Sequence, residues 1–352
     1  MSLGVGLSLG GNRILVVGGA GFVGSNLVRM ILAGSPRVRI TVVDNLLSSE
    51  RISVSRDKRV DFIRGSIADD AVISRIGDRY AFVFHLATYH GNQSSIHDPL
   101  RDHANNTLTT LKLMNRLRGY RKIRKMVYSS AGCSCAVKTF GRPRATTEDA
   151  PISLVQDSPY SISKIIGEFY SLYFFRQYGL PVVRARFQNV YGPGEILGAG
   201  KWRGTPATVW RNVTPTFVYK ALKGRPLPLE NGGRATRDFI FVDDICRGLI
   251  ACALRGRPGE VYNLASGRET TIRKLADAIN GITANKAGFL RLPRRPWDHS
   301  GRRFGSTEKA ARMLGFRAVT GLREGIERTV AWTRENLPLI ERCMRKHDKY
   351  MR

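Results

Sequence analysis

The chain has 352 residues, which is long enough for a substantial hydrophobic core, and 42% of them are hydrophobic, an ordinary fraction for a globular protein. No apolar stretch approaches the roughly 18 to 20 residues of a membrane-spanning helix, so we expect a soluble, cytoplasmic protein without membrane insertion. Five cysteines do not make a disulfide framework, and the net charge of +29 favours anionic partners, with nucleic acid as one alternative. Cys133 and Cys135 form a CxC pair, but no second pair or histidine cluster accompanies it, so we expect no metal site.

Short apolar runs and helical patterns alternate along the first half of the chain. Residues 1–12 are interpreted as a loose tail, and residues 13–18 predict a buried strand that leads through a glycine-rich turn into a helix ending near residue 32. Further strands are predicted at 38–43, 82–86, 126–128 and 182–186, and helices at 105–117 and 161–178. This alternation predicts an α/β fold with a doubly wound parallel sheet over residues 13–188.

The pattern changes after residue 188 to stretches rich in glycine and proline. Helices are predicted at 213–223, 272–280 and 307–314. We therefore expect residues 189–352 to form mostly a smaller C-terminal substrate-binding part. A short strand entering a helix at 238–254 indicates that residues 238–265 return to the first domain.

A GxxGxxG pattern occupies residues 18–24, where the first predicted strand passes into a helix. Glycines at this position let backbone amides and the helix N-terminus approach a pyrophosphate. Asp44 ends the next strand, twenty residues beyond Gly24, and can accept hydrogen bonds from both hydroxyls of an adenosine ribose. Because this carboxylate would repel a 2′-phosphate, the pattern predicts a Rossmann-type domain that binds NAD rather than NADP.

Tyr160 and Lys164 have the YxxxK spacing within a predicted helix. This spacing places the phenol and the ammonium one turn apart on the same helix face. A nearby ammonium stabilises the phenolate, so Tyr160 is a candidate general base.

Together these motifs resemble the extended short-chain dehydrogenase/reductase family, which includes NAD-dependent nucleotide-sugar epimerases and dehydratases. The resemblance covers nearly the whole chain. It rests on the cofactor loop at 17–25, the ribose-binding turn at 43–45, His85-Leu86-Ala87 beside the nicotinamide, and the SPYxxSK pattern at 158–164. Gly65-Ser66-Ile67-Ala68-Asp69 is similar to the family's GDxxD stretch, with Ser66 in place of the aspartate that reaches adenine.

The resemblance implies specific roles for residues of this chain. Tyr160 removes the proton of a sugar hydroxyl, Lys164 holds the nicotinamide ribose, and Ser130, chosen over Ser129 and Ser134, hydrogen-bonds the reacting oxygen. It implies that the cofactor is bound by Gly18, Gly21, Phe22, Val23, Gly24, Asp44, Asn45, Ser66, Ile67, Leu86, Ala87, Asn105, Tyr160, Lys164 and Gln188.

Gly132 and Cys133 bear on the type of reaction. Nucleotide-sugar 4,6-dehydratases resemble TDEVYG at this point and use an Asp-Glu pair to move protons, and this chain lacks that pair. Simple redox chemistry at carbon 4 is therefore favoured. Cys133 is similar to the cysteine base of 3,5-epimerases, so that reaction is an alternative.

The resemblance also implies a diphosphate-sugar site. Besides Ser130, its predicted substrate-binding residues are Asn189 in the RxxNVYGP-like stretch, Arg237 in the RDFxxVxD-like stretch, and Arg295; two forked guanidiniums suit a diphosphate. We expect a 4-epimerase of a UDP-hexose or UDP-hexuronic acid, with a dehydrogenase or reductase, a 3,5-epimerase, or a nucleic-acid-binding protein on the same scaffold as alternatives. A homodimer formed through the helices at 105–117 and 161–178 is expected from the resemblance.

Overall fold

The computed structural model describes residues 9–89, 91–132, 141–298 and 301–351, and the site predictions at Cys133 and Ser134 lie outside these ranges. Its centre is a seven-stranded parallel sheet with the order β10-β6-β5-β4-β1-β2-β3. The strands are β1 (Arg13–Val17), β2 (Arg39–Asp44), β3 (Val60–Arg64), β4 (Phe82–His85), β5 (Lys125–Ala131), β6 (Val182–Phe187) and β10 (Val261–Leu264). This confirms the predicted doubly wound α/β fold. The strand order reverses between β1 and β4, and in such sheets ligands bind at the carboxyl ends of the strands at that point.

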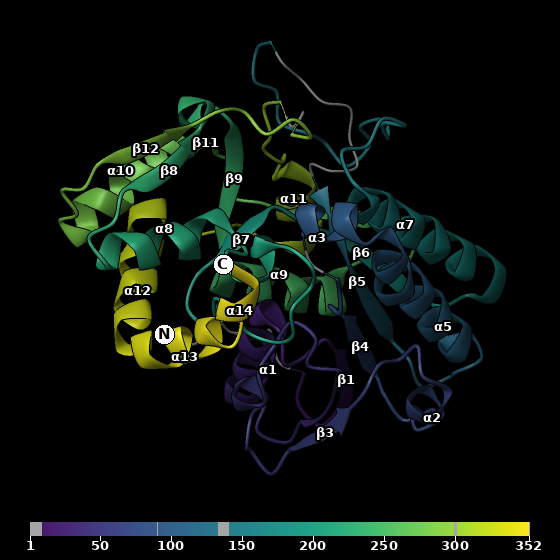
Figure 1. Ribbon diagram of the computed structural model, residues 1–352. Coiled ribbons are helices and arrows are strands. Elements are labelled where there is room, and N and C mark those ends of the chain that lie inside the picture. Colours follow the sequence, from purple (N-terminus) through teal and green to yellow (C-terminus); the bar gives the residue numbers. More distant parts are fainter. Residues whose placement is uncertain (1–8, 90, 133–140, 299–300, 352) are drawn as a thin grey trace.

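Both faces of the sheet are covered by helices, as Figure 1 shows. Successive side chains of β1 point to opposite faces, so Ile14 and Val16 pack in one core and Leu15 and Val17 in the other. Helices α1 (Phe22–Gly34) and α9 (Val242–Arg255) bury their apolar sides in the first core, and α5 (Leu108–Leu117) and α7 (Pro159–Tyr178) do so in the second. Burial on both faces explains why the strands read as continuous apolar runs.

Short helices follow β2, β3 and β4. They are α2 (Asp70–Ile73), α3 (Asn92–His97), α4 (Pro99–Asp102), a π-helical turn η2 (His103–Thr107) that leads into α5, and a 3-10 turn η1 (Arg51–Ser53). The predicted helix over 105–117 is thus a π-helical turn followed by an α-helix.

The C-terminal half builds two small sheets beside the main one. β7 (Asn189–Tyr191), β9 (Thr236–Phe241) and β11 (Glu269–Thr271) form one, and β8 (Leu227–Glu230) pairs with β12 (Phe289–Leu292) in the other. The chain returns to the main sheet at β10. The remaining elements are α8 (Val213–Leu222), α10 (Ile272–Thr283), α11 (Glu308–Leu314), α12 (Leu322–Glu335), α13 (Leu337–Arg345), α14 (Asp348–Met351), η3 (Pro206–Thr208) and η4 (Asn231–Gly233).

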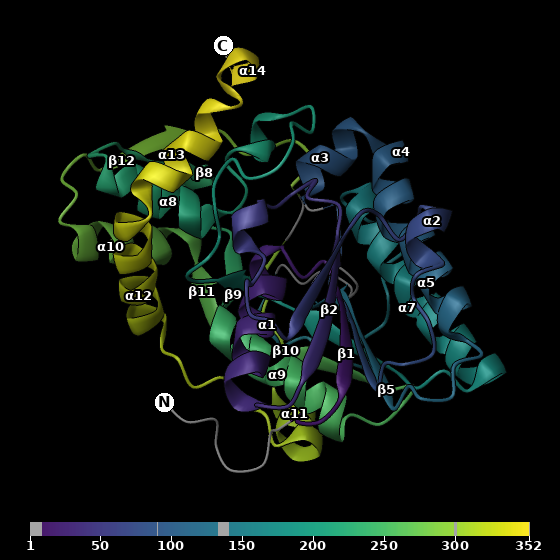
Figure 2. The ribbon, with the colours of Figure 1, turned by 90° about the horizontal axis from the view of Figure 1, so that it is seen from below.

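In Figures 1 and 2 the last helices, α12 and α13, lie beside α8, on the side of the molecule away from α5 and α7. β7 begins two residues after β6 ends, so the three-stranded sheet starts at the carboxyl end of β6. Within the residues that the structure describes, no helix has the combination of length and apolar character that crossing a membrane requires.

Candidate active site

The glycine-rich turn between β1 and α1 packs closely against the loop that follows β4. Gly18 has a φ of 85°, and a Cβ atom there would lie 2.5 Å from the backbone nitrogen of Ala87. At Gly24 a Cβ atom would lie 2.2 Å from the carbonyl oxygen of Gly18, so α1 can approach β1 only without a side chain there. Gly21 is the N-cap of this 13-residue helix and gives it no side-chain cap. The helix N-terminus is therefore suited to receive an anionic group.

Asp44 ties the glycine-rich turn to the turn that follows β2. Its carboxylate accepts hydrogen bonds from the backbone nitrogens of Ala20 (3.0 Å) and Leu46 (2.8 Å) and from Ser49 Oγ (3.0 Å). Burial raises the pKa of Asp44, and these hydrogen bonds oppose that rise. Asn45 shapes the same turn, because its Oδ1 accepts from the backbone nitrogen of Leu47 (2.9 Å). The predicted ribose-binding pair thus adjoins the predicted pyrophosphate loop.

The predicted adenine contacts lie in the next turn along the sheet edge. Ser66 and Ile67 follow β3, which neighbours β2, and the backbone nitrogen of Gly65 donates to the carbonyl oxygen of Asp44 (3.0 Å). Ser66 Oγ accepts from the backbone nitrogen of Ala68 (3.2 Å), and Ile67 is buried. The turn therefore flanks Asp44 on the side away from β1.

On the nicotinamide side, the structure favours Asn106 over Asn105 as the residue that supports the loop after β4. Asn105 donates to the carbonyl oxygen of Arg101 within its own helical turn (2.9 Å). Asn106 is buried instead, and its Oδ1 accepts from the backbone nitrogen of Tyr89 (2.7 Å) and from Thr88 Oγ1 (3.0 Å). The sequence prediction named Asn105, and the rotation of the helical turn places the adjacent Asn106, not Asn105, against this loop.

The predicted catalytic pair lies at the start of α7. Ser158 caps this helix, accepting a hydrogen bond from the backbone nitrogen of Ser161 (3.3 Å). Lys164 is buried, and its Nζ lies 5.7 Å from the ring centroid of Tyr160 and donates to the carbonyl oxygen of Ser129 (3.0 Å). Burial, and then the charge of Lys164, lower the pKa of His85 to about 3. His85 is therefore neutral, and Tyr160 remains the predicted proton-exchanging side chain beside Lys164.

Ser130 takes part in a buried charged cluster. Its hydroxyl donates to Glu168 Oε1 (2.6 Å), and Arg186 Nε (2.8 Å) and Arg184 Nη1 (3.3 Å) bind the same carboxylate. These arginines keep the pKa of Glu168 low despite the burial that opposes it. Because this carboxylate engages the Ser130 hydroxyl, a role toward the reacting oxygen stays a prediction.

Gln188 and Asn189 lie between β6 and the first small sheet. Gln188 is 9% exposed, and its Nε2 is 2.2 Å from a Cβ atom built on Gly132 and 2.8 Å from one built on Gly305. Both glycines thus make room for this amide. Asn189 begins β7 and is exposed, a position open to a ligand.

The two predicted diphosphate-binding arginines have different partners. Arg237 Nη2 lies 3.4 Å from Asp298 Oδ2, and its Nη1 donates to the carbonyl oxygen of Thr236 (2.7 Å). Arg295 Nε binds Glu230 Oε1 (2.5 Å). The structure brings Arg237 to the 294–298 segment, whereas it directs Arg295 to β8. A diphosphate must therefore share or replace these carboxylate partners.

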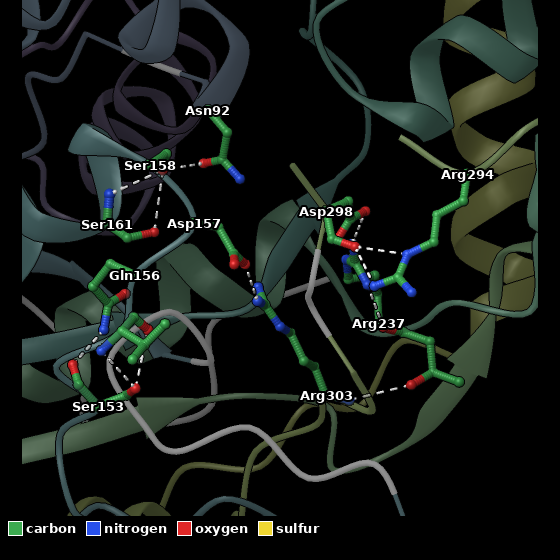
Figure 3. A network of polar contacts seen from close by, with 12 residues as sticks. Asn92, Ser153, Gln156, Asp157, Ser158, Ser161, Arg237, Arg294, Asp298 and Arg303 are labelled. Carbon is green, nitrogen blue, oxygen red and sulfur yellow. Dashed lines mark hydrogen bonds and ion pairs between the residues drawn. The ribbon is translucent and has the colours of Figure 1, made fainter. Parts of the chain in front are cut away.

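An ion pair that the sequence did not indicate joins the two halves of the site. Arg303 Nη2 lies 3.1 Å from Asp157 Oδ2, and both side chains are mostly buried. The backbone nitrogen of Arg303 also donates to Thr236 Oγ1 (3.2 Å). In Figure 3 Asp157, just before the α7 cap Ser158, points toward Arg303, and Asp298 lies between Arg237 and Arg294. The pair links the start of the Tyr160 helix to β9.

Comparison with known proteins places this site in a family. Residues 14–265 match the model of the NAD dependent epimerase/dehydratase family. A dTDP-glucose 4,6-dehydratase of Actinoplanes sp. is 30% identical over 337 residues, covering 92% of this chain and 98% of that protein. A UDP-glucose 4-epimerase of Mycolicibacterium smegmatis is 31% identical over 330 residues, covering 92% and 98%.

The solved structures agree with this assignment. The Bordetella bronchiseptica enzyme WbmF in complex with NADH is 59% identical, with a TM-score of 0.88 and coverage of 98% of both chains. The chain therefore belongs to the NAD-dependent epimerase/dehydratase family. This confirms the family that the motifs resemble and the expectation of an NAD-dependent enzyme.

Proposed function

We propose that this protein is an epimerase that inverts carbon 4 of a nucleotide-diphosphate sugar, a UDP-hexose or a UDP-hexuronic acid, through a transient 4-keto intermediate. The Tyr160 and Lys164 pair at the carboxyl edge of the sheet carries the proposal. The relatives divide between dehydratases and epimerases at 30% and 31% identity, so identity alone does not choose between them. Gly132 and Cys133 favour the epimerase, because they occupy the positions where the dehydratases have the Asp-Glu pair that elimination requires.

A uridine nucleotide is supported by two solved structures of relatives. WbmF, 59% identical, was crystallised with NAD+ and UDP, and a UDP-glucose 4-epimerase of Thermotoga maritima, 31% identical with a TM-score of 0.81, was crystallised with UDP-glucose. Arg237 and Arg295 supply the cationic groups that a diphosphate needs, and Asn189 is exposed at the start of β7, which pairs with β9, the strand that carries Arg237.

In this proposal the residues of the chain hold the cofactor across the carboxyl edge of the sheet. The backbone of residues 18–24 receives the pyrophosphate, Asp44 and Asn45 the adenosine ribose, Ser66 and Ile67 the adenine, and Leu86, Ala87 and Gln188 the nicotinamide side. Phe22 and Val23 contribute the first backbone groups of α1. Bound NAD supplies a reversible hydride acceptor.

Tyr160 and Lys164 then carry the proton chemistry. Tyr160 takes the proton of the 4-hydroxyl, while the Lys164 ammonium stabilises the phenolate and holds the nicotinamide ribose. After the keto sugar rotates in the site, Tyr160 returns a proton to the oxygen on carbon 4, with the hydrogen now on the opposite face. The cofactor is regenerated in each cycle, so no net NADH forms.

A second copy of this chain is the proposed partner at the outer face of α7. Ile162, Phe169 and Tyr173 recur at helical spacing and are 47%, 54% and 51% exposed. An apolar stripe of this kind on one helix is suited to an isologous dimer with the matching helices α5 and α7 of the partner copy. Sedimentation should give a dimer for the natural chain and a monomer for Phe169→Glu with Tyr173→Glu.

The test of function is incubation of the purified protein with NAD and a panel of UDP-, GDP-, CDP- and dTDP-sugars. Products are separated by chromatography, and NADH is followed by absorbance. The proposal predicts an epimer of unchanged mass from a UDP-sugar without net NADH. Stoichiometric NADH would instead indicate a dehydrogenase, and loss of water a dehydratase.

Tyr160→Phe is the control for this panel, because it removes one oxygen and leaves the remainder of α7 in place. It should bind NAD and UDP as the natural chain does and form no epimer. If no sugar reacts with either protein, and salt-sensitive RNA binding is found in both, the proposal fails in favour of the nucleic-acid alternative.

A further inference from the structure

The segment 198–211 lies directly over the turn that follows β2. The backbone nitrogen of Lys201 donates to the carbonyl oxygen of Leu47 (3.0 Å), and that of Gly200 donates to Glu50 Oε1 (2.8 Å). Arg211 Nη1 donates to the carbonyl oxygen of Ser48 (2.7 Å). These bonds join residues about 150 positions apart in the sequence, and they hold the segment against the predicted ribose turn.

Arg203 is the side chain that this segment sends into the interior. It is 2% exposed, its Nη1 donates to Ser48 Oγ (2.6 Å), and its guanidinium lies 5.8 Å from the ring centroid of Tyr89. Ser48 follows β2 and Tyr89 follows β4, and β1 lies between these two strands in the sheet. A group that contacts both turns lies over the carboxyl end of β1, where the 18–24 loop begins.

The surroundings of Arg203 leave its charge without an acidic partner. Among the residues that the structure describes, no carboxylate pairs with Arg203, and its buried Nε has no hydrogen-bond acceptor. Burial, and after it the charge of Arg211, lower the pKa of Arg203 to about 10, so the guanidinium remains charged at neutral pH. Glu195, a buried carboxyl that interacts with Arg211, has a pKa raised to about 7 by burial, which makes it a weak counterion. A buried cation without a counterion is unfavourable unless a ligand supplies one.

We propose that Arg203 binds the pyrophosphate of NAD from the side opposite the backbone amides of residues 18–24. The pyrophosphate carries two negative charges, and a guanidinium binds phosphate oxygens through a planar fork of donors. Arg203 then supplies a counter-charge that the glycine-rich loop, which offers only backbone dipoles, does not. This assignment rests on the cofactor placement proposed above and is independent of which sugar is epimerised.

A hollow on the surface would let an anion other than NAD reach Arg203. Arg203 is among the residues that line an outer hollow of about 450 Å³. The hollow is lined by His97, Asp98, Arg101, Lys201, Trp202, Arg203, Gly204 and Tyr350. An anion that entered there, such as the phosphates of the nucleotide sugar, would reach Arg203 without any contact with NAD, so the experiment must separate the two ligands.

The experiment compares ligand affinities of NAD-free protein in three variants: Arg203→Met, Arg203→Lys and the control Lys201→Met. Lys201 is exposed and lines the same hollow, so its substitution removes a cation from the hollow without removing the buried guanidinium of Arg203. Calorimetry measures the Kd of NAD, ADP-ribose, adenosine and UDP. We expect Arg203→Met to raise the Kd of NAD and ADP-ribose at least tenfold, with adenosine and UDP unchanged within twofold. Arg203→Lys should give an intermediate loss, and Lys201→Met none.

The melting temperature provides a second measurement. If Arg203 had only a structural role, Arg203→Met would melt at a lower temperature than the natural chain. Without NAD, Arg203→Met should melt at the same temperature as the natural chain or higher, because it removes a buried charge. The rise in melting temperature on adding NAD should shrink in this variant. Unchanged NAD and ADP-ribose affinity overturns the assignment, as does a loss for UDP alone. If the natural chain itself binds no NAD, the cofactor placement fails instead.

Discussion

The two loops that border the proposed cofactor site are held in place by different kinds of interaction. Residues 18–24 take their form from neighbours in sequence and from close backbone contact, as at Gly24, where a Cβ atom would lie 2.2 Å from the Gly18 carbonyl oxygen. The segment 198–211 takes its form from side chains far away, such as Ser48, Glu50 and His347. At Gly18 and Gly24 of the first loop a side chain would clash with backbone atoms, whereas the second segment is held by contacts that side chains make.

The largest expected effect concerns the predicted proton-transfer side chain at the start of α7, which lies in neither loop. Tyr160→Phe should lower kcat by a factor of roughly 100 to 10,000, the range for loss of a general acid-base group. Affinity for NAD should remain, since the phenol oxygen is the only atom removed. Steady-state turnover of the best UDP-sugar, with NAD titration in parallel, measures both. A mutant that keeps more than a tenth of kcat would show that another group exchanges the proton.

The buried cluster below the site should control stability more than chemistry. Glu168→Ala leaves Arg184 and Arg186 without their carboxylate, and breaking a buried pair in this way lowers the free energy of unfolding by about 3 to 5 kcal/mol. Urea unfolding followed by circular dichroism measures the loss.

Ser130→Ala separates the two roles considered for that residue. It removes the hydrogen bond to Glu168 and should lower stability by about 1 to 2 kcal/mol. If Ser130 also bonds the reacting oxygen, kcat falls at least tenfold as well. An unchanged kcat with reduced stability would move the third catalytic role to another hydroxyl.

The sequence predicts those parts of the site in which a local pattern determines the geometry. The spacing of Tyr160 and Lys164, the glycines at 18–24 and the acid at the end of β2 each follow from one element or one turn. The sequence does not show that Asn106, next to the predicted Asn105, supports the loop after β4, because adjacent residues differ only in helix rotation, and here a π-helical turn sets that rotation. Arg203 and the Asp157 and Arg303 pair could not be found in this way. Arg203 and Ser48 are 155 residues apart, and Arg303 and Asp157 are 146 residues apart. The sequence has no pattern that predicts contacts over such separations.

The pH dependence of stability tests Glu195, a buried residue just before segment 198–211. The folded-state pKa of Glu195 is raised from 4.5 to about 7, because burial disfavours its charged form. The folded protein therefore binds this proton more tightly than the unfolded chain does, and the free energy of unfolding falls as the pH rises from about 4.5 to 7. Glu195→Gln should remove this fall, so the variant gains on the order of 1 to 3 kcal/mol relative to the natural chain between pH 5 and pH 8. A difference in urea unfolding that does not change with pH would contradict it.

The smallest expected effect concerns the C-terminal helices that cover segment 198–211. His347 Nε2 lies 2.8 Å from the carbonyl oxygen of Gly198, and Trp202 stacks on Tyr350 with ring centroids 4.8 Å apart. Tyr350 is 46% exposed, so Tyr350→Ala should lower stability by only about 0.5 to 1.5 kcal/mol. Its larger consequence should be kinetic, because a looser segment releases the cofactor sooner than the intact one.

Stopped-flow displacement of NAD by excess ADP-ribose measures this rate, with Tyr178→Ala, which lies at the far end of α7, as the control. A faster release in Tyr350→Ala alone would show that the last helices keep segment 198–211, and Arg203 with it, over the ribose turn. Equal release rates in both variants would mean that the bonds to Ser48 and Glu50 hold the segment without help from the C-terminus.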